Sequence, residues 1–174
     1  MPGGMVWLVG LMGAGKSAVG RRLAARLGLQ FVDSDLEIER ETRSSIAEIF
    51  AREGEAAFRR RERAFIDAWS DRPAIVALGG GAMAQEGIPA LLAKTGRSVY
   101  LRALPETLAA RVGSGEGRPL LAGLDEAGRL EKLTELLAVR GPSYDAADLT
   151  VDTDGKSADA VAAEICAALG EEIE

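Results

Sequence analysis

The sequence predicts a three-layer α/β domain built on a mainly parallel sheet. Short apolar runs alternate with amphipathic helical patterns along the chain, and a glycine-rich turn joins the first run to the first helix. The 174 residues suit one domain with a substantial core. Neither an internal repeat nor a Pro/Gly/Ser-rich linker divides the chain, so we treat it as a single domain.

The first predicted strand is the apolar run 5–9, typical of a strand buried on both faces. After Lys16, apolar residues recur at helical spacing as far as Leu27, and Gly28 supplies a stop signal. Strand, glycine loop and helix in this order aim the amino terminus of a helix at an anion.

The loop between them, residues 10–17, fits the pattern G-x-x-x-x-G-K-[ST]. Such a loop turns its backbone N–H groups inward around phosphates; here Lys16 would reach the β- and γ-phosphates and the Ser17 hydroxyl would bind Mg²⁺. Glycines are needed because a Cβ would block close approach of a phosphate. A glycine-rich turn without a ligand is the alternative, and the flanking strand and helix favour phosphate binding.

The remaining elements follow from the same patterns. Further strands are predicted at 31–32, 74–78, 98–101 and 149–151. Helices are predicted over 36–70 with breaks near Ser44 and Gly54, over 88–94, from Pro105, from Asp125 as N-cap, and over 158–169. Glycines at 113, 115 and 117 punctuate a polar segment that ends at Gly123, the best candidate for a mobile lid.

The composition excludes several classes of function. A net charge of −6 and a pI near 4.9 argue against a broad nucleic-acid-binding surface, so an anionic substrate must meet a local group of arginines. The absence of histidine leaves proton transfer to a carboxylate, Lys or Tyr.

The single cysteine, Cys166, forms no intrachain disulfide and is typical of a small buried hydrophobe. Because no apolar run has the length of a membrane span and no signal-like segment opens the chain, we expect a cytoplasmic protein without a membrane partner.

Asp33 and Asp35 follow the second predicted strand, at the edge where parallel sheets bind ligands. If the chain is extended there, one residue between them puts both carboxylates on one side. One could hold the metal shell while the other accepts a proton from a substrate hydroxyl. Alone, such an acidic turn is more often a solvated loop or a helix cap.

Several motifs occur in one order, and their combination is more specific than any one of them. They are the phosphate loop, Asp33-x-Asp35, Gly54-Glu55-x-x-Phe58-Arg59, Gly79-Gly80-Gly81, Arg118-Pro119-Leu120-Leu121 and Arg140-x-x-x-Tyr144. Together they resemble the shikimate kinase family over nearly the whole chain, from about Met5 to Leu169.

The resemblance implies a P-loop fold like that of nucleoside monophosphate kinases, with a five-stranded parallel sheet. It also implies a substrate-binding helical subdomain at about 34–62 and a lid at about 113–124. The implied reaction, in aromatic amino acid biosynthesis, moves the γ-phosphate of ATP to the 3-hydroxyl of shikimate with Mg²⁺. The implied partners are these small molecules, and we expect a monomer.

The resemblance also assigns roles to residues. Lys16, Asp35 and Arg118 would be catalytic, with Asp35 binding substrate hydroxyls and serving as the base. Ser17 and Asp33 would bind Mg²⁺. Nucleotide contacts would come from Gly13, Ala14, Gly15, Lys16, Ser17, Ala18, Arg111 and Arg118. Shikimate would be held by Asp35, Arg59, Gly80, Gly81 and Arg140.

The arginine roles suit the chemistry, since a guanidinium matches a carboxylate with two parallel hydrogen bonds and stays charged. Arg59 and Arg140 would hold the shikimate carboxylate, Arg118 would neutralise the transferring phosphoryl group, and Arg111 would stack on adenine. Without the family pattern, the run 59–63 would be interpreted as a solvated helix face, and Arg111 as a helix-surface cation.

The chain departs from the family pattern at Ala18, where Thr is common. Losing that hydroxyl predicts weaker nucleotide binding without loss of activity. Asp145, where the family often has Glu, is a minor change. The adenine loop near 154–156 matches too loosely to name a contact.

Three alternatives stay open at this stage. Another P-loop small-molecule kinase, similar to gluconate kinase, would share the loop but would not explain the glycine triplet together with Arg59 and Arg140. A nucleotide-dependent switch protein would need an Asn-Lys-x-Asp motif, and the chain contains no Asn. An inactive binding module would not be expected to keep Lys16, Asp35 and Arg118.

Overall fold

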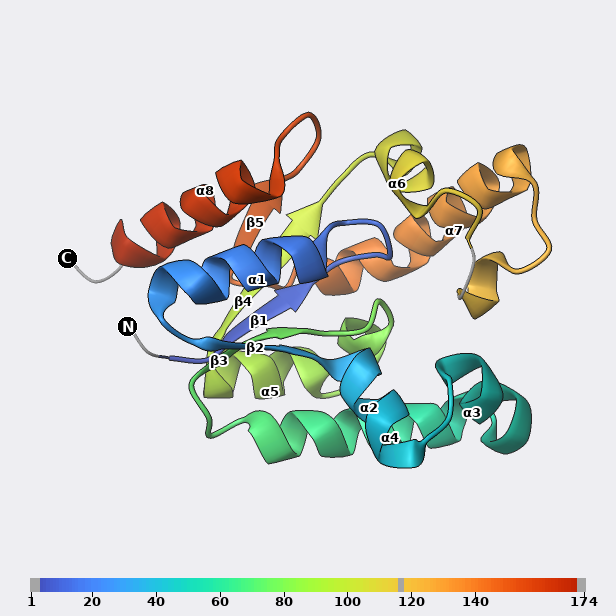
Figure 1. Cartoon of the computed structure of the whole chain (residues 1–174), viewed down its shortest axis with the longest axis horizontal. Helices are drawn as coiled ribbons and strands as arrows, with labels where there is room; N and C mark the ends of the chain where they lie inside the picture. The colour runs from blue at the N-terminus through green and yellow to red at the C-terminus, as the bar shows by residue number, and fades with distance from the viewer. Residues whose placement is uncertain (1–3, 116–117, 172–174) are drawn as a thin grey trace.

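The computed structural model describes residues 4–115 and 118–171 and has a parallel five-stranded sheet at its centre (Figure 1). The strand order is β2-β3-β1-β4-β5, and all four neighbouring pairs are parallel. The strands are β1 (Val6–Val9), β2 (Gln30–Asp33), β3 (Ala74–Ala77), β4 (Arg97–Arg102) and β5 (Leu149–Asp152). The predicted fold class is confirmed.

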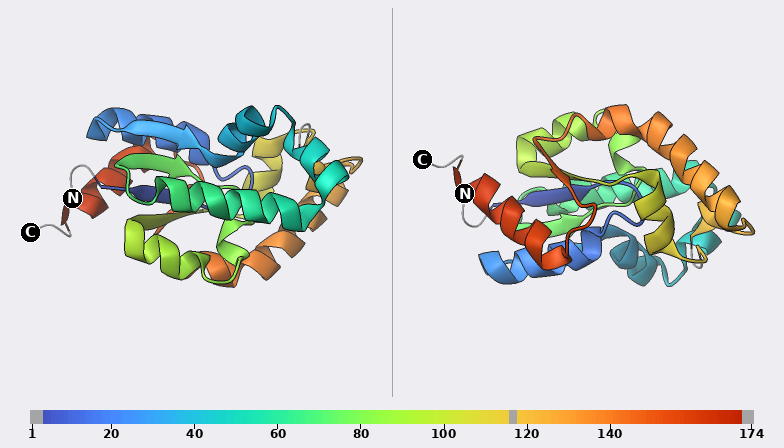
Figure 2. Two further views of the ribbon diagram at one scale, coloured as in Figure 1. Left: turned by 90° about the horizontal axis from the view of Figure 1, so that it is seen from below. Right: turned by 90° about the horizontal axis from the view of Figure 1, so that it is seen from above.

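Helices connect the strands and cover both faces of the sheet. The α-helices are α1 (Lys16–Leu27), α2 (Ser34–Thr42), α3 (Ile46–Glu53), α4 (Glu55–Trp69), α5 (Ile88–Thr95), α6 (Pro105–Val112), α7 (Glu126–Tyr144) and α8 (Ala158–Glu171). Two short 3₁₀ turns are η1 (Ala82–Ala84) and η2 (Pro119–Leu121). In the views from below and above, α1 and α8 lie on one side of the sheet and α5 and α7 on the other (Figure 2).

The core forms where the sequence is most apolar. Every residue of β1 and β3 is buried, as expected of central parallel strands with helices on both faces. The Trp7 side chain is fully buried, and its indole N–H donates to the Thr95 hydroxyl at 3.2 Å. Burying the ring stabilises the sheet, and the hydrogen bond keeps its one polar atom satisfied.

Helix ends lie at the signals that the sequence provides. Gly28 ends α1 with a φ of +67°, and its N–H donates to the Ala24 carbonyl. Pro105 is at the start of α6, where its missing N–H costs no hydrogen bond. The Asp125 side chain caps α7 by accepting from the Gly128 N–H at 2.7 Å.

The expectation of extended backbone through residues 33–35 is wrong. Helix α2 already begins at Ser34, so Asp33 ends β2 and acts as the N-cap, its side chain accepting from the Leu36 N–H at 3.2 Å. Asp35 lies in the first turn of α2. Capping explains the difference, because Asp33 satisfies a free N–H group of the helix when the strand ends at once.

Helices α2, α3 and α4 form a region beyond the carboxyl end of β2 (Figure 1). The predicted breaks near Ser44 and Gly54 separate them. Ile38, Ile49 and Phe58 make a small core of their own, against which Ile46 and Phe50 pack. This second core holds the three helices together beside the edge of the sheet.

The predicted lid segment includes Glu116 and Gly117, which lie outside the described residues. In the described part, Leu121 of η2 is buried in the main core, while Arg118 and Leu120 are exposed. One side chain thus anchors this segment to the domain. Within residues 4–115 and 118–171, no helix has both the length and the apolar character needed to cross a membrane.

Candidate active site

The phosphate loop leads from β1 into α1. Gly15 is the N-cap of α1 with a φ of +93°, and no side chain caps the helix. The first N–H groups of α1 are therefore available to an anion. Gly13 has a φ of +85°, and a Cβ there would come within 2.9 Å of the Leu108 carbonyl oxygen. Both the turn and the packing behind the loop require glycine at this position.

Lys16, in the first turn of α1, folds back over the loop. Its ammonium donates to the Gly10 carbonyl at 2.5 Å and to the Leu11 carbonyl at 3.3 Å. Burial lowers the pKa of Lys16 to about 8, opposed by Asp35 and Asp33 and assisted by Arg118 and Arg140. Phosphate oxygens beside this ammonium would favour its charged form again.

Ser17 and Asp33 meet beside the loop, the Ser17 hydroxyl donating to Asp33 Oδ2 at 2.8 Å. A hydroxyl and a carboxylate together are oxygen ligands of the kind that Mg²⁺ takes, along with waters and substrate phosphates. The described residues contain no group of three or more His, Cys, Asp or Glu that could hold a metal alone. Ser17 and Asp33 therefore fit a Mg²⁺ ion that depends on phosphate and water for its other ligands.

The Asp35 carboxyl faces the loop from the first turn of α2. Burial raises its pKa to about 6, the nearby Asp33 adds to the rise, and Lys16 opposes it. Its Oδ1 atom is buried and accepts no hydrogen bond among the described residues. A carboxylate with a pKa near neutral and one unused acceptor suits proton abstraction from a hydroxyl.

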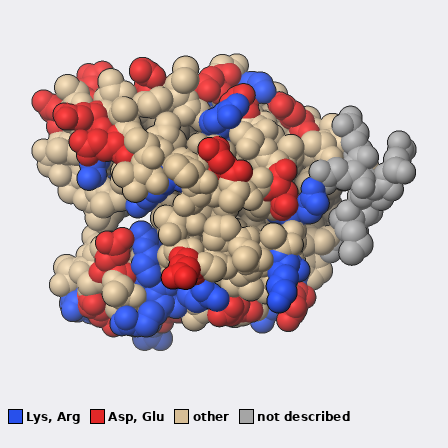
Figure 3. Space-filling view, turned by 180° about the vertical axis from the view of Figure 1, so that it is seen from behind, with Lys and Arg blue, Asp and Glu red and all other residues tan. Residues whose placement is uncertain are grey.

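A cavity of about 130 Å³ opens next to Asp35, between the α2–α4 region and the segment that carries η2. It is lined by Met12, Asp35, Ile46, Phe50, Phe58, Arg59, Glu62, Gly79–Gly81, Arg118–Leu120 and Arg140. Seen from behind, the molecule has a hollow on this side, with Lys and Arg atoms on its walls (Figure 3). Three arginines and two carboxylates thus converge on a small cavity beside the phosphate loop.

The glycine triplet after β3 makes room for the charged groups of this cavity. A Cβ on Gly79 would lie 2.7 Å from Glu62 Oε2 and 2.8 Å from Asp35 Oδ1. On Gly80 it would lie 3.2 Å from Arg140 Nη1, and on Gly81 it would lie 2.3 Å from Arg59 Nη2. None of the three has a positive φ, so the need for glycine here is steric.

Glu62 also belongs to this site, although none of the sequence motifs includes it. Its side chain is fully buried, its Oε1 accepts from Arg59 at 2.8 Å and from Gln85 at 2.6 Å, and its Oε2 accepts no hydrogen bond among the described residues. Burial raises its pKa to about 7, against the opposing effect of Arg59. Its spacing from Phe58 and Phe65 puts it on the apolar face of α4, a signal in the sequence that could have revealed it.

Arg59 therefore differs from the solvated helix face expected for the run 59–63, because one of its partners is buried. Its Nη1 pairs with buried Glu62, and its Nη2 pairs with exposed Glu55 at 3.3 Å. These two carboxylates fix the guanidinium at the cavity wall. Arg60, Arg61 and Arg63 of the same run are exposed.

Arg111 and Ala18 lie outside this cavity. The Arg111 guanidinium donates to the Gly13 and Ala14 carbonyls at 3.3 Å each, and to the Thr153 hydroxyl and carbonyl at 2.9 Å each. It thereby ties the phosphate loop to the turn after β5. These bonds use the N–H groups in the plane of the guanidinium, so its face stays suited to stacking. Ala18 is exposed in the first turn of α1.

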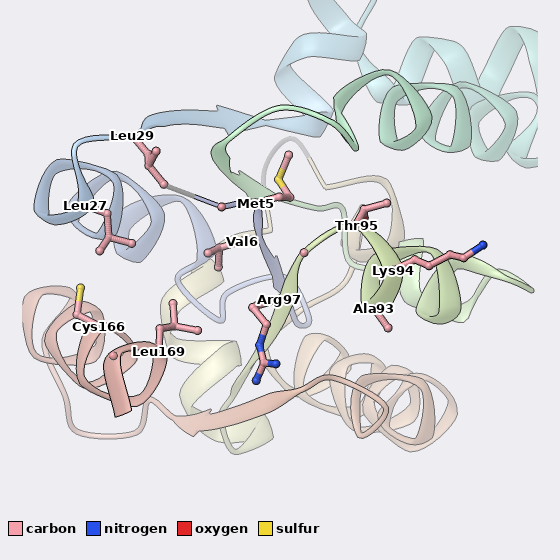
Figure 4. A pocket seen from close by; sticks show the side chains of 13 residues that line it. Met5, Val6, Leu27, Leu29, Ala93, Lys94, Thr95, Arg97, Cys166 and Leu169 are labelled. Carbon is pink, nitrogen blue, oxygen red and sulfur yellow. The ribbon is translucent and has the colours of Figure 1, made fainter. Parts of the chain in front are cut away.

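A larger cavity, of about 570 Å³, lies at the opposite, amino-terminal edge of the sheet (Figure 4). Its walls are mainly apolar and come from β1, α1, α5 and α8, with Cys166 among the lining residues. None of the predicted site residues lines it. Ligands of open α/β sheets bind at the carboxyl ends of the strands, so the arginine-lined cavity is the better candidate active site.

The sequence model of the family described as "Shikimate kinase" matches residues 12–170. The chain belongs to the shikimate kinase family. Its relatives include the shikimate kinase of Moorella thermoacetica, 44% identical over 170 residues that cover 97% of this chain and 95% of that protein. The Chlorobium chlorochromatii shikimate kinase is 43% identical over 158 residues, covering 87% and 83%. Members of this family are ATP-dependent phosphotransferases that act on an alcohol, and so is this chain.

Solved structures agree with this membership. The shikimate kinase of Acinetobacter baumannii, solved in complex with shikimate, superposes with a TM-score of 0.90 at 39% identity and covers 97% of this chain and 94% of its own. A gluconokinase from Sinorhizobium meliloti reaches a TM-score of 0.62 at 16% identity, a likeness of fold alone. The alternative of a gluconate-kinase-like enzyme is thus disfavoured for this shikimate kinase family member.

Proposed function

We propose that this enzyme transfers the γ-phosphoryl group of ATP to the 3-hydroxyl of shikimate in the arginine-lined cavity. One observation supports the proposal above all: Asp35, Arg59, Arg118 and Arg140 line the same small cavity beside Lys16. The carboxylate of shikimate needs cations, and its hydroxyl nucleophile needs a base. The transferring phosphoryl group needs positive charge beside its oxygens. The cavity supplies all three.

In this proposal, the N–H groups at the start of α1 and the Lys16 ammonium bind the β- and γ-phosphates. Gly13, Ala14, Gly15, Ser17 and Ala18 form that cradle. Mg²⁺, held by Ser17 and through water by Asp33, would reduce the charge repulsion between the phosphates and the incoming hydroxyl. Arg111 offers its guanidinium face to the adenine.

Arg59 and Arg140 hold the shikimate carboxylate, and Asp35 accepts hydrogen bonds from the ring hydroxyls. As the 3-oxygen bonds to the γ-phosphorus, its proton passes to Asp35. The bond between the γ-phosphorus and the bridging oxygen breaks, and that oxygen leaves on ADP. Arg118 neutralises charge on the phosphoryl group during transfer.

We propose residues 34–62 as the shikimate-binding subdomain and residues 113–124 as the lid that carries Arg118. The buried Leu121 suits an anchor, and the exposed Leu120 suits a surface that covers the acceptor. Closure would exclude water and limit wasteful hydrolysis of ATP. A monomer stays our expectation, which light scattering coupled to size exclusion would test.

The experiment is ADP release from ATP and Mg²⁺ with no acceptor, shikimate, quinate or gluconate. We expect strong release with shikimate and background release in the other three. Release with gluconate alone would keep the kinase and overturn the acceptor. No release with any acceptor would overturn the proposal, and nucleotide binding would then show whether the phosphate loop still functions.

A further inference from the structure

The last residue of α7, Tyr144, lies one helical turn after Arg140 and is almost fully buried. Its hydroxyl donates a short hydrogen bond to the Gly80 carbonyl oxygen. Arg140 lies beside the same hydroxyl, and its charge opposes the rise that burial causes in the pKa of Tyr144. The phenol hydroxyl therefore donates to the glycine loop and leaves its lone pairs to the Arg140 side.

The Tyr144 ring is held from the opposite side. It stacks on the ring of Tyr100, in β4, with 4.9 Å between the centroids and an interplanar angle of 27°. Such stacking fixes the plane of the ring and hence the direction in which the hydroxyl points. The sheet thus positions the hydroxyl, and the hydroxyl in turn contacts two elements of the site.

Both partners of the hydroxyl line the acceptor cavity, while Tyr144 itself does not. Arg140 Nη1 lies 3.2 Å from the place that a Cβ on Gly80 would occupy, so the guanidinium and the glycine loop are already in close contact. A shift of either would change the distance between Arg140 and Arg59, which faces Gly81 from α4. Two guanidiniums that hold one carboxylate need a fixed separation.

We propose that Tyr144 is a positioning residue for acceptor recognition: its hydroxyl ties Arg140 to Gly80 and so fixes the two-arginine site for the acceptor carboxylate. This inference rests on the proposed function and deepens it. It predicts that loss of one oxygen atom, which cannot touch the acceptor, weakens binding of the acceptor selectively.

The test is Tyr144→Phe, which keeps the ring and its stacking. We expect the KM for shikimate to rise about 10-fold, as expected for one lost buried hydrogen bond. We expect kcat and the KM for ATP to change less than about 3-fold, because neither the base nor the phosphate loop is touched. The matched control is Tyr100→Phe, which removes the hydroxyl from the other ring of the stack and should leave all three parameters unchanged.

A purely structural role for Tyr144 would give a different result. Equal losses in kcat and in both KM values, or an unchanged KM for shikimate, would overturn the inference. If Tyr144→Phe unfolds at a much lower temperature, the double variant with Arg140→Lys distinguishes a positioning role from a general loss of stability. A positioning role predicts that Tyr144→Phe adds less than about 2-fold to the KM effect of Arg140→Lys, and a full additional 10-fold would overturn it.

The acceptor itself separates this inference from the proposed function. Wild-type enzyme that does not phosphorylate shikimate contradicts the proposed function. Wild-type enzyme that does so, combined with an unaffected Tyr144→Phe variant, contradicts the positioning role alone. With shikimate methyl ester, which lacks the charge that Arg140 would bind, Tyr144→Phe should have little effect; a 10-fold effect there would overturn the inference.

Discussion

Asp35 has the raised pKa that suits a general base, and one of its buried carboxyl oxygens lacks a hydrogen-bond donor within the described chain. Its raised pKa comes first from burial and then from Asp33, and its Oδ1 atom accepts no hydrogen bond within the described chain. A shikimate hydroxyl would supply the missing donor. The same features that make the carboxylate costly to bury make it able to remove a proton near neutral pH.

A substitution at Asp35 tests its proposed role as the base. We expect Asp35→Asn to lower kcat by about 10²–10⁴-fold, the usual contribution of a positioned base. ATP binding, measured by calorimetry, should be retained because the phosphate loop is intact. In the wild type, kcat/KM for shikimate should fall as the pH drops below about 6, since the protonated carboxyl cannot accept a proton. A variant with near wild-type turnover would refute the assignment.

Glu62 shows why the residues of the candidate site could be predicted only in part from the sequence. The sequence places Glu62 among charged neighbours but at apolar-face spacing on α4, and the packed structure adds that it lies close to Gly79. The roles of Lys16 and Ser17 could be read from a local motif. The convergence of Arg59 and Arg140 on one cavity depends on contacts between distant segments, which no local pattern records.

At the scale of elements, the glycine triplet is a spacer that admits charged side chains from three helices. Gly79 faces Asp35 of α2 and Glu62 of α4, Gly80 faces Arg140 of α7, and Gly81 faces Arg59 of α4. A buried strand that ends in three glycines is typical of a close approach by a ligand or another group. It did not indicate that the space would be taken by the enzyme's own carboxylates and guanidiniums.

Gly81→Ala tests this role without straining the backbone, because φ −98° and ψ −1° are allowed for alanine. The new Cβ would overlap the Arg59 guanidinium and displace it from Glu62. We expect the KM for shikimate to rise at least about 10-fold, with little change in the KM for ATP. Gly170→Ala, in α8 with open space at the Cβ position, is the control.

An unchanged KM for shikimate in Gly81→Ala would mean that Arg59 can move aside without cost. The two-arginine site would then not depend on the glycine loop.

The ends of the helices could be predicted from capping and helix-breaking residues in the sequence. The packing partners of the helices could not. Gly28, Pro105 and Asp125 lie at helix ends as predicted. Phe58 shares a helical stripe with Phe65 and Ile66, yet it packs in the small core with Ile38 and Ile49 while the other two join the main core. Helix α4 contributes side chains to both cores, and the periodicity of its apolar residues does not show which residue packs in which core.

For the molecule as a whole, the buried carboxyls Asp35 and Glu62 of the candidate site lower the free energy of unfolding at neutral pH. The folded-state pKa of Asp35 is raised from 3.8 to about 6, so the folded protein binds this proton more tightly than the unfolded chain. The stability gained from that proton is present below pH 3.8 and is lost as the pH rises to about 6. Glu62 acts in the same direction between pH 4.5 and about 7.

We therefore expect Asp35→Asn to stabilise the protein relative to the wild type, and increasingly so as the pH rises from 4 to 7. The gain at pH 7 should be about 1–3 kcal/mol, since one pKa unit corresponds to about 1.4 kcal/mol. Urea unfolding at several pH values measures it. A difference between variant and wild type that does not grow over this range would contradict the burial of an ionised Asp35.

The parallel sheet and the position of the candidate site at the carboxyl ends of its strands follow from the alternation of buried strands and amphipathic helices. This part of the account was predictable because each element carries its own signal. The assembly of the cavity was not, because it requires α2, α4, α7 and the β3–η1 turn to meet.

A comparison of shikimate with shikimate methyl ester as acceptors tests directly whether the arginine-lined cavity binds the acceptor carboxylate. Because Arg59 and Arg140 are proposed to bind the acceptor carboxylate, the ester should lose about 100-fold or more in kcat/KM, as expected for two lost charge-assisted hydrogen bonds. In Arg59→Ala the preference for the acid should fall by at least about 10-fold. An ester phosphorylated as efficiently as the acid by the wild type would contradict the account, because the arginine-lined cavity would then not be the carboxylate site.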